Sequence, residues 1–405
     1  MDKKALVVAG GQWQVPLILF LKNKGYWVTV VDPYDDSKGV LVADGHIKSD
    51  VREKEFVFSK IREKYDIVAT DQSDVSVDTV AYLSEKMGVL GNQEAVVEKF
   101  SNKYLSRVYA TTIGVPVPEF TEVSNLEQLK EVVKKMTKPL IIKPCDAQSS
   151  KGIHVVNEHT TEQELGMYLE DAMRYSFCKR VIVEQFVPGY EITVEGFCSD
   201  GKHQVMAISK KKHFKTGIAS TLTYPADMPE SIRKRVVECD NLYVEKSGLR
   251  FGPTHAEYIV DEKKDAFYLI EIACRGGGTL ISSDIVKWVS GFDVYEAYLA
   301  NLQGKTVDVK GHNPLNRCAE LHFFDFGSGL VKSVNGVEES KLLDGVFVLD
   351  VPIQVGDHIH TCSDDRSRQG FVIVFADTQD ELQERIKKVC DTIVVEISDE
   401  SHTDI

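Results

Sequence analysis

The chain has 405 residues, of which 43% are hydrophobic and 27% are charged, an ordinary globular balance in a chain long enough for two or three packed units. Its formal net charge of -14 argues against nucleic acid or an anionic membrane as the main partner. The sequence shows no apolar run that could span a bilayer, no secretory signal and no Cys-x-x-Cys pair among its 8 cysteines, so we expect a cytoplasmic protein without disulfides or structural zinc.

The N-terminal stretch alternates short apolar runs with amphipathic segments, as a parallel α/β unit does. The apolar runs predict strands over residues 5–9, 27–31 and 66–70, and the amphipathic segments predict helices over residues 15–24, 77–87 and 102–112. A Gly-Val-Pro-Val-Pro run then interrupts the last helix, because proline lacks an amide hydrogen. We therefore place the end of a first domain at residue 119.

A glycine turn in this first domain has two interpretations. Gly10 and Gly11 follow the first strand and Asp32 ends the second, which is the order of a dinucleotide site whose acid holds a ribose. That fingerprint also needs a glycine where the helix packs on the strand, and Val15 and Pro16 stand there. The sequence therefore favours a plain turn over NAD binding.

The rest of the chain is richer in strands that glycine-containing turns connect. Strands are expected over residues 139–143, 153–156, 181–186, 191–198, 204–209, 254–260 and 267–272. The last two flank an Asp-Glu-Lys-Lys-Asp turn, so we expect an antiparallel hairpin. A final unit has short strands and a helix over residues 379–391. The predicted fold class is mixed α/β and α+β, with domains at 1–119, 120–311 (including a flexible lobe over about 120–188) and 312–405.

A lysine and the polar loop after it point to phosphate chemistry. Lys143 ends an apolar strand, where a buried ammonium group must reach water or meet an anion. The loop that follows contains Ser149, Ser150 and Gly152, and its hydroxyls and backbone amides could lie against phosphate oxygens. Taken alone, such a loop is more often a surface turn.

The next candidate residues surround a tight Pro-Gly turn. Glu184 precedes this turn and Glu191 follows it. An acid and exposed backbone beside Phe186 and Val187 suit the amino group and the π face of an adenine. Glu191 could accept hydrogen bonds from ribose hydroxyls.

Two acids and an arginine complete the pattern. Glu257 and Glu271 lie on opposite strands of the predicted hairpin, at spacings that can place both carboxylates on one face. The carboxylates would repel each other, and Mg²⁺ shared with phosphate oxygens would remove the repulsion; two solvated acids are the alternative. Arg275 precedes three glycines and is a fork donor suited to a substrate carboxylate or a transferring phosphoryl group.

As an ordered set, these motifs resemble the ATP-grasp superfamily, specifically its carboxylate–amine ligases. L-amino-acid ligases, purine-biosynthetic carboxylases and biotin carboxylases are the relatives. The motifs are Lys-Pro, Ser-Ser-x-Gly, Glu-x-x-x-x-Gly-x-Glu and Glu…Glu-x-x-x-Arg, and the resemblance covers nearly the whole chain. It implies an ATP-grasp fold with an N-terminal Rossmann-like α/β unit, two lobes that clasp ATP, and a small C-terminal α+β unit.

For the nucleotide, the resemblance assigns each residue to a part of ATP. It implies that Lys103 touches the phosphates, that Lys143 reaches adenine and the α-phosphate, and that Glu191 accepts from the ribose. The other residues belong to the adenine hinge (Glu184, Phe186 and Val187) or to the loop over the β- and γ-phosphates (Ser149, Ser150 and Gly152).

For the metal and the substrate, the resemblance makes Glu257 and Glu271 the Mg²⁺ ligands and Arg275 the catalytic residue that orients the substrate. Mn²⁺ is an expected substitute. Many members carry a third metal ligand, an asparagine, two residues after the second glutamate; this chain has Ala273 there, which leaves open whether one or two ions bind. His213 lies where relatives often carry basic groups near the γ-phosphate.

The reaction that the resemblance implies has two steps. A carboxylate attacks the γ-phosphate to give an acyl phosphate and ADP, and an amine then displaces phosphate to form an amide. The expected partners are small-molecule carboxylates and amines, and a homodimer is in keeping with the superfamily. Two alternatives stay open: a carboxylase that activates bicarbonate as carboxyphosphate, and a nucleotide-binding module without catalysis. The sequence does not select the acid or the amine.

Overall fold

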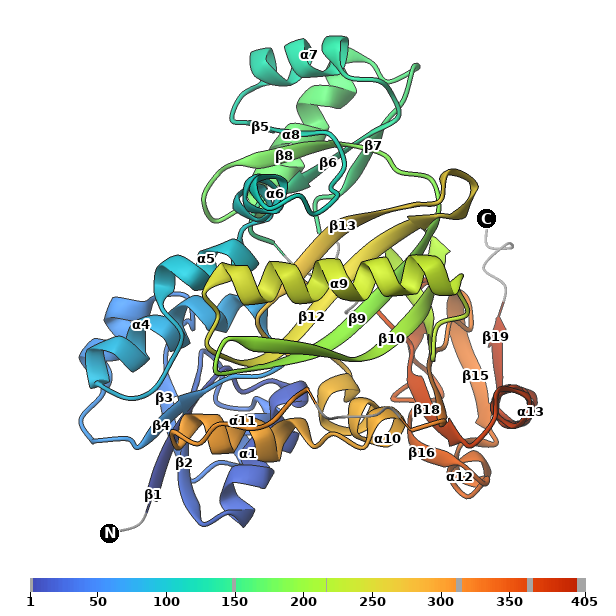
Figure 1. Cartoon of the computed structure of the whole chain (residues 1–405). Coiled ribbons are helices and arrows are strands. Elements are labelled where there is room, and N and C mark those ends of the chain that lie inside the picture. The colour runs from blue at the N-terminus through green and yellow to red at the C-terminus, as the bar shows by residue number, and fades with distance from the viewer. Residues whose placement is uncertain (1–2, 148–150, 216, 311–314, 363–366, 399–405) are drawn as a thin grey trace. The chain divides into compact units, whose positions relative to one another are not determined.

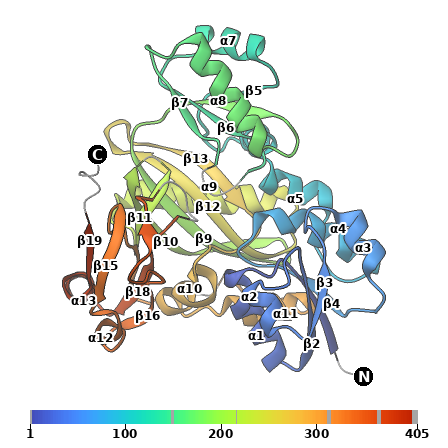
Figure 2. The ribbon, with the colours of Figure 1, turned by 180° about the vertical axis from the view of Figure 1, so that it is seen from behind.

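The computed structural model describes residues 3–147, 151–215, 217–310, 315–362 and 367–398 (Figures 1 and 2). The chain forms two compact units. The first unit comprises Met1–Phe120, Val194–Ala207 and Met228–Pro314, and the second comprises Thr121–Thr193, Ile208–Asp227 and Leu315–Ile405. Because the units interleave along the chain, the three domains expected in sequence order stay a prediction. No helix in the described part of the chain has the length and apolar character that a membrane crossing requires.

A parallel sheet opens the first unit, with the strand order β3-β2-β1-β4. Its strands are β1 Lys3–Val8, β2 Tyr26–Asp32, β3 Gly45–Lys48 and β4 Ile67–Ala69. The helices that connect them are α1 Val15–Asn23, α2 Lys38–Val42, α3 Lys54–Lys60 and α4 Val77–Met87, with short 3-10 turns η1 Gln12–Gln14 and η2 Asp74–Ser76. The strands are near-continuous apolar runs because side chains from both faces of this sheet are buried. The predicted α/β unit is confirmed.

The glycine turn after β1 is closed by protein contacts. The Gly10 amide donates to one carboxylate oxygen of Asp32 at 2.9 Å, and the other oxygen accepts from the Tyr34 amide and the Ser37 hydroxyl. A Cβ atom added at Gly10 would lie 2.6 Å from a methyl carbon of Val30. The turn therefore needs glycine for close packing on the sheet, and Asp32 fixes the turn.

The remainder of the first unit holds helices and an antiparallel hairpin. Its helices are α5 Glu94–Ser101, α6 Lys103–Thr112, α9 Glu230–Ser247, α10 Val286–Ser290 and α11 Val294–Leu302, with short helical turns η3 Glu262–Lys264 and η4 Ile281–Ile285. The hairpin consists of β12 Phe251–Asp261 and β13 Ala266–Ala273, which pair antiparallel as predicted. β9 Tyr190–Ser199 and β10 Lys202–Lys215 extend this sheet in the order β13-β12-β9-β10.

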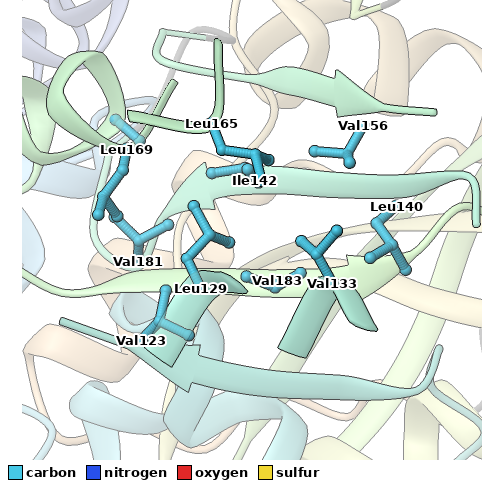
Figure 3. Packing of buried hydrophobic residues seen from close by; sticks show 11 residues of the cluster. Val123, Leu129, Val133, Leu140, Ile142, Val156, Leu165, Leu169, Val181 and Val183 are labelled. Carbon is cyan, nitrogen blue, oxygen red and sulfur yellow. The ribbon is translucent and has the colours of Figure 1, made fainter. Parts of the chain in front are cut away.

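The second unit contains a small lobe with its own core. Four strands lie in the order β5-β8-β6-β7, and two helices pack on them (Figure 1). The elements are β5 Phe120–Val123, α7 Leu126–Lys135, β6 Leu140–Pro144, β7 His154–Val156, α8 Glu162–Tyr175 and β8 Val181–Gln185. Figure 3 shows alternate residues of the central strands packed together with residues of both helices: Leu140, Ile142, Val181 and Val183 with Leu129, Val133, Leu165 and Leu169. Because strand side chains alternate, the residues between them belong to the opposite face.

The rest of the second unit continues from β10 in the order β10-β11-β14-β18-β16, with β17-β15-β19 as a separate sheet. The elements are β11 Ile218–Tyr224, β14 Cys318–Phe323, β15 Gly329–Asn335, α12 Val337–Lys341, β16 Val346–Asp350, β17 His358–Ile359, β18 Phe371–Ala376, α13 Gln379–Thr392 and β19 Val394–Ser398. The strand pairs from β10 to β16 in this order are antiparallel. The predicted helix near the C-terminus is confirmed as α13.

Candidate active site

The two predicted metal ligands face each other across the β12–β13 hairpin. Glu257 pairs directly with Glu271, and His255 pairs directly with Ala273. Directly opposed residues of an antiparallel pair share a face, with Cβ atoms about 4.5–5.5 Å apart. The four residues therefore occupy one patch of the sheet, in which His255 lies opposite the position where many ATP-grasp ligases carry asparagine.

Two cationic groups contact these acids. The Lys103 ammonium lies 2.9 Å from Glu271, and His255 bridges Glu195 (Nδ1 to Oε1, 2.7 Å) and Glu257 (Nε2 to Oε1, 3.6 Å). Burial alone would lower the pKa of Lys103, but the attraction of Glu271 outweighs it and raises the pKa. Burial likewise opposes protonation of His255, and the two acids raise its pKa to about 9. This patch therefore holds protonated cations among carboxylates at neutral pH.

Arg275 is held in place by Asp74, at the start of η2. Its Nε donates to Oδ1 at 2.7 Å, its Nη2 donates to Oδ2 at 2.8 Å, and its Nη1 donates to the Gly276 carbonyl at 3.0 Å. Burial would raise the pKa of Asp74, but the charge and hydrogen bonds of Arg275 lower it. Because the two parallel bonds use the fork of the guanidinium, Asp74 fixes the plane of Arg275.

A second buried acid anchors the loop after Arg275. Asp71 accepts from the Gly276 amide at 2.9 Å, the Ser282 hydroxyl at 2.6 Å and the Tyr295 hydroxyl at 3.0 Å. Burial raises the pKa of Asp71 despite these bonds. A Cβ atom at Gly276 would lie 2.2 Å from the Ser282 Cβ, so only glycine fits here. The loop is thus tied to the segment after β4.

In the second unit, Lys143 and Glu184 form a buried ion pair on the face of the lobe sheet opposite its core. The Lys143 Nζ lies 2.5 Å from Glu184 Oε2, and the side chains are 7% and 3% exposed. β6 and β8 are paired, so the two residues are diagonal neighbours on one face. The Phe186 amide donates to the Pro139 carbonyl at 2.9 Å, which extends this pairing into the predicted adenine hinge.

Glu191, the predicted ribose acceptor, contacts two basic side chains of β10. The Lys211 ammonium bonds to one carboxylate oxygen, and the His213 Nε2 lies 3.1 Å from the other. Ser149 and Ser150 lie outside the described residues, so their role stays a prediction. Gly152 of the same loop has a φ angle of +66°.

Gly152 packs too closely for a larger residue. A Cβ atom there would lie 3.0 Å from the Ala172 Cα of α8. We expect Gly152→Ala to lower stability by about 1–2 kcal/mol from the left-handed backbone alone and to raise the KM for ATP as the loop shifts. Gly201→Ala is the matched control, because Gly201 has a φ of +71° and a Cβ atom added there would meet no atom within 4 Å. Equal KM values for ATP in the two variants would contradict the role of the loop.

Several of these residues were not predicted from the sequence: Asp71, Asp74, Glu195 and Lys211. Asp71 and Asp74 follow a parallel strand, and ligand sites of α/β sheets gather at the carboxyl ends of such strands, so this signal was available. Lys211 precedes His213 by two positions on β10, but a register shift between Lys212 and His213 interrupts the alternation of faces, so the spacing did not predict that both contact Glu191. Glu195 gave no such signal, because its partner His255 is 60 positions away.

The facing acids suit a magnesium ion. Among the described residues, no group of three or more His, Cys, Asp and Glu side chains forms a protein-only metal site. Mg²⁺ does not need such a site, because it is bound by one or two carboxylates and otherwise by waters and phosphate oxygens. Glu257 and Glu271 meet that requirement, and Lys103 beside them suits the phosphates that would complete the coordination.

Comparison with known proteins identifies the family. A family model of the ATP-grasp domain matches residues 136–284, and one of the L-amino acid ligase C-terminal domain 2 matches residues 322–398. The chain contains an ATP-grasp domain. ATP-grasp ligases use ATP to form carbon–nitrogen bonds and release ADP, and this chain is an enzyme of that class.

Similar proteins span several reactions of the ATP-grasp superfamily. The formate-dependent phosphoribosylglycinamide formyltransferase of Methanococcus maripaludis is 24% identical over 73% of this chain and 85% of its own length. The L-amino acid ligase of Bacillus licheniformis has a TM-score of 0.82 at 21% identity, over 98% and 99% of the two chains. A third similar structure is the biotin carboxylase domain of Hydrogenobacter thermophilus 2-oxoglutarate carboxylase, which is a dimer in complex with MgADP, ADP and bicarbonate. It has a TM-score of 0.73 at 16% identity, over 98% of this chain and 91% of that chain. The ATP-grasp fold is thus shared, and the comparisons do not select one reaction.

Asp74 offers a test of how Arg275 is used. We expect Asp74→Asn to raise the KM for the carboxylate substrate by about tenfold or more, because a neutral amide cannot accept both N–H groups of the fork as a carboxylate does. Steady-state kinetics at saturating ATP measures this effect. Asp36→Asn, an exposed change in the same unit, is the control. An unchanged KM in the Asp74 variant would contradict a substrate-orienting role for Arg275.

Proposed function

We propose that the enzyme is an ATP-dependent carboxylate–amine ligase that forms an amide through an acyl phosphate and releases ADP and phosphate. The observation that carries the proposal is the patch of Glu257 and Glu271, with Lys103 on one acid, together with the Arg275 fork that Asp74 fixes. This chemistry needs acids that bind a cation, and it needs basic groups that bind phosphate and carboxylate.

The C-terminal match favours an amide-forming ligase over a carboxylase. Residues 322–398 match a domain described for L-amino acid ligases, and the Bacillus licheniformis L-amino acid ligase shares the fold over 98% of this chain. We therefore propose amino acids as the first class of acid and amine to test. Mn²⁺ is proposed as a substitute for Mg²⁺, since both ions take oxygen ligands.

The residues of the second unit are proposed to bind the nucleoside part of ATP. Lys143 would donate to adenine and the α-phosphate, and Glu184 would keep this lysine in place. Since the Phe186 amide is used by Pro139, the hinge would contact adenine through the Phe186 carbonyl and the Val187 amide. Glu191 would accept from the ribose while Lys211 and His213 supply positive charge. Ser149, Ser150 and Gly152 are proposed to cover the β- and γ-phosphates.

The residues of the first unit are proposed to act at the reacting end. Glu257 and Glu271 would hold Mg²⁺, which when bound neutralises charge on the phosphates. Lys103 would donate to the phosphate oxygens, and Arg275 would orient the attacking carboxylate. Positioning of this kind accounts for about 7–11 kcal/mol of barrier in favourable intramolecular reactions. Since the acyl phosphate reacts with water, the loop near Gly152 is expected to close over it.

The test is ADP release at fixed ATP and Mg²⁺ across a matrix of amino acids, other carboxylates and amines. We expect ADP only in wells that contain both an acid and an amine, with an amide in equal amount by mass spectrometry. ADP release with bicarbonate alone would replace the proposal by carboxylation. ATP binding without turnover in any well would favour a module that has lost catalysis.

A further inference from the structure

Two cysteines lie together just beyond the strand that carries Lys143. Cys145 follows β6 and is fully buried, and Cys178 lies exposed in the segment between α8 and β8. Both are free thiols. The Cys145 amide also donates to the Arg180 carbonyl at 3.2 Å, so the two backbone segments are adjacent.

Asp146 holds the segment around Cys178 against the end of β6. Its Oδ1 accepts from the Ser176 hydroxyl at 2.8 Å and from the Phe177 amide at 3.1 Å, and its Oδ2 accepts from the Cys178 amide at 2.7 Å. The Ser176 hydroxyl lies 3.4 Å from the Cys178 sulfur. The backbone that carries Cys178 is therefore fixed next to Cys145 by three hydrogen bonds to one carboxylate.

The two thiols differ in a way that suits oxidation. Hydrogen bonds from Cys145 and Ser176 outweigh partial burial and the nearby Asp146 charge and lower the pKa of Cys178 to about 7. The pKa of Cys145 is raised by the interaction with Cys178, by burial and by the Glu122 carboxylate, which lies 3.9 Å from the Cys145 sulfur. An exposed thiolate next to a protonated resolving thiol is the usual arrangement of redox-sensing cysteines.

We propose that hydroperoxides convert this pair into a Cys145–Cys178 disulfide, and that the disulfide weakens ATP binding. The Cys178 thiolate attacks the terminal peroxide oxygen, so that an S–O bond forms, the O–O bond breaks and the alcohol (water, for hydrogen peroxide) leaves with one proton. The Cys145 sulfur then attacks the resulting sulfenic acid; an S–S bond forms, the S–O bond breaks, and water leaves with the Cys145 proton. Two thiols are oxidised and one peroxide is reduced.

The position of the pair explains the expected effect on ATP. Cys145 is two residues after Lys143, and Asp146 starts the connection to Gly152. A disulfide holds its two sulfurs about 2.05 Å apart, and so draws the two segments together. The shift reaches Lys143 and the start of the loop. This consequence for ATP rests on the proposed function, whereas the formation of the disulfide does not.

The first measurement treats the full, reduced protein with hydrogen peroxide and alkylates the remaining thiols. We expect two of the eight thiols to be lost, a cross-linked peptide pair containing Cys145 and Cys178, and full recovery with dithiothreitol. Cys178→Ser should abolish the cross-link. Cys390→Ser, which changes another exposed thiol, should leave it intact. A Cys145 that is still alkylated after Cys178 has been oxidised would overturn the proposal.

The second measurement compares ATP binding by calorimetry in the reduced, oxidised and re-reduced protein. We expect oxidation to raise the Kd for ATP by about tenfold, which corresponds to the loss of one charged contact, and reduction to restore the original Kd. Cys178→Ser should show no change with peroxide. A disulfide-containing protein with an unchanged Kd would overturn the link to ATP. Absence of ATP binding by the reduced protein would instead contradict the proposed function, and the peptide map would still decide whether the disulfide forms.

Discussion

Glu271→Gln is expected to lower ADP formation by about 10²–10³-fold or more while the fold is kept. Glutamine keeps the shape of the side chain but removes the negative charge that faces Glu257 and that pairs with Lys103. Without that charge, the patch binds Mg²⁺ more weakly, and the phosphate groups that share the ion are less well positioned. ADP release with a coupled assay measures the loss, and circular dichroism checks the fold.

Glu262→Gln is the matched control for this change. Glu262 lies exposed in the turn of the same hairpin, so the substitution removes one negative charge at a distance from the patch. We expect normal ADP release from this variant. Titration with Mn²⁺, followed by electron paramagnetic resonance, should show weaker binding only in the Glu271→Gln variant. Near-normal turnover in that variant would refute the metal role.

Lys143→Met is expected to destabilise the protein by about 3–5 kcal/mol, because it leaves the Glu184 carboxylate buried without its cation. Adding Glu184→Gln should recover most of this loss, since it removes the buried charge that the first change leaves without its cation. ATP binding should not recover: both variants lose the lysine, and we expect their Kd for ATP to rise by about 10–100-fold. Urea unfolding and calorimetry give the two quantities separately.

The control for the lysine change is Lys135→Met on α7 of the same lobe. Its side chain is 76% exposed, so a change of no more than about 0.5 kcal/mol is expected, with unaltered ATP binding. A double variant that binds ATP as tightly as the wild type would show that Lys143 stabilises the lobe but does not contribute to ATP binding. A single variant as stable as the wild type would show that Glu184 is not held by the ion pair.

The parts of the site that could be predicted are those that local patterns determine. Glu257 and Glu271 were expected to share a face because strand side chains alternate and the intervening turn identified a hairpin, and their direct pairing confirms this. Lys143 stood out because a lysine at the end of an apolar strand needs a partner. Its partner, Glu184, was instead assigned to adenine, and the ion pair between them came only from the structure.

Contacts between distant segments were not accessible from the sequence. Asp74 and Arg275 are 201 positions apart, and nothing local to either residue indicates the other.

Helix α9 was also not among the predicted elements. Two of its six buried positions are polar, Asp240 and Ser247, so its apolar stripe is broken and the helical period is obscured.

The most direct test of the acyl-phosphate route is isotope transfer with the acid that the substrate matrix identifies. The acid is labelled with ¹⁸O in its carboxylate, and the released phosphate is analysed by mass spectrometry. We predict one ¹⁸O atom in each phosphate, because the carboxylate oxygen bonds to the γ-phosphorus and leaves with it when the amine attacks the carbonyl carbon. Unlabelled phosphate released together with the amide would contradict the acyl phosphate and, with it, the proposed mechanism.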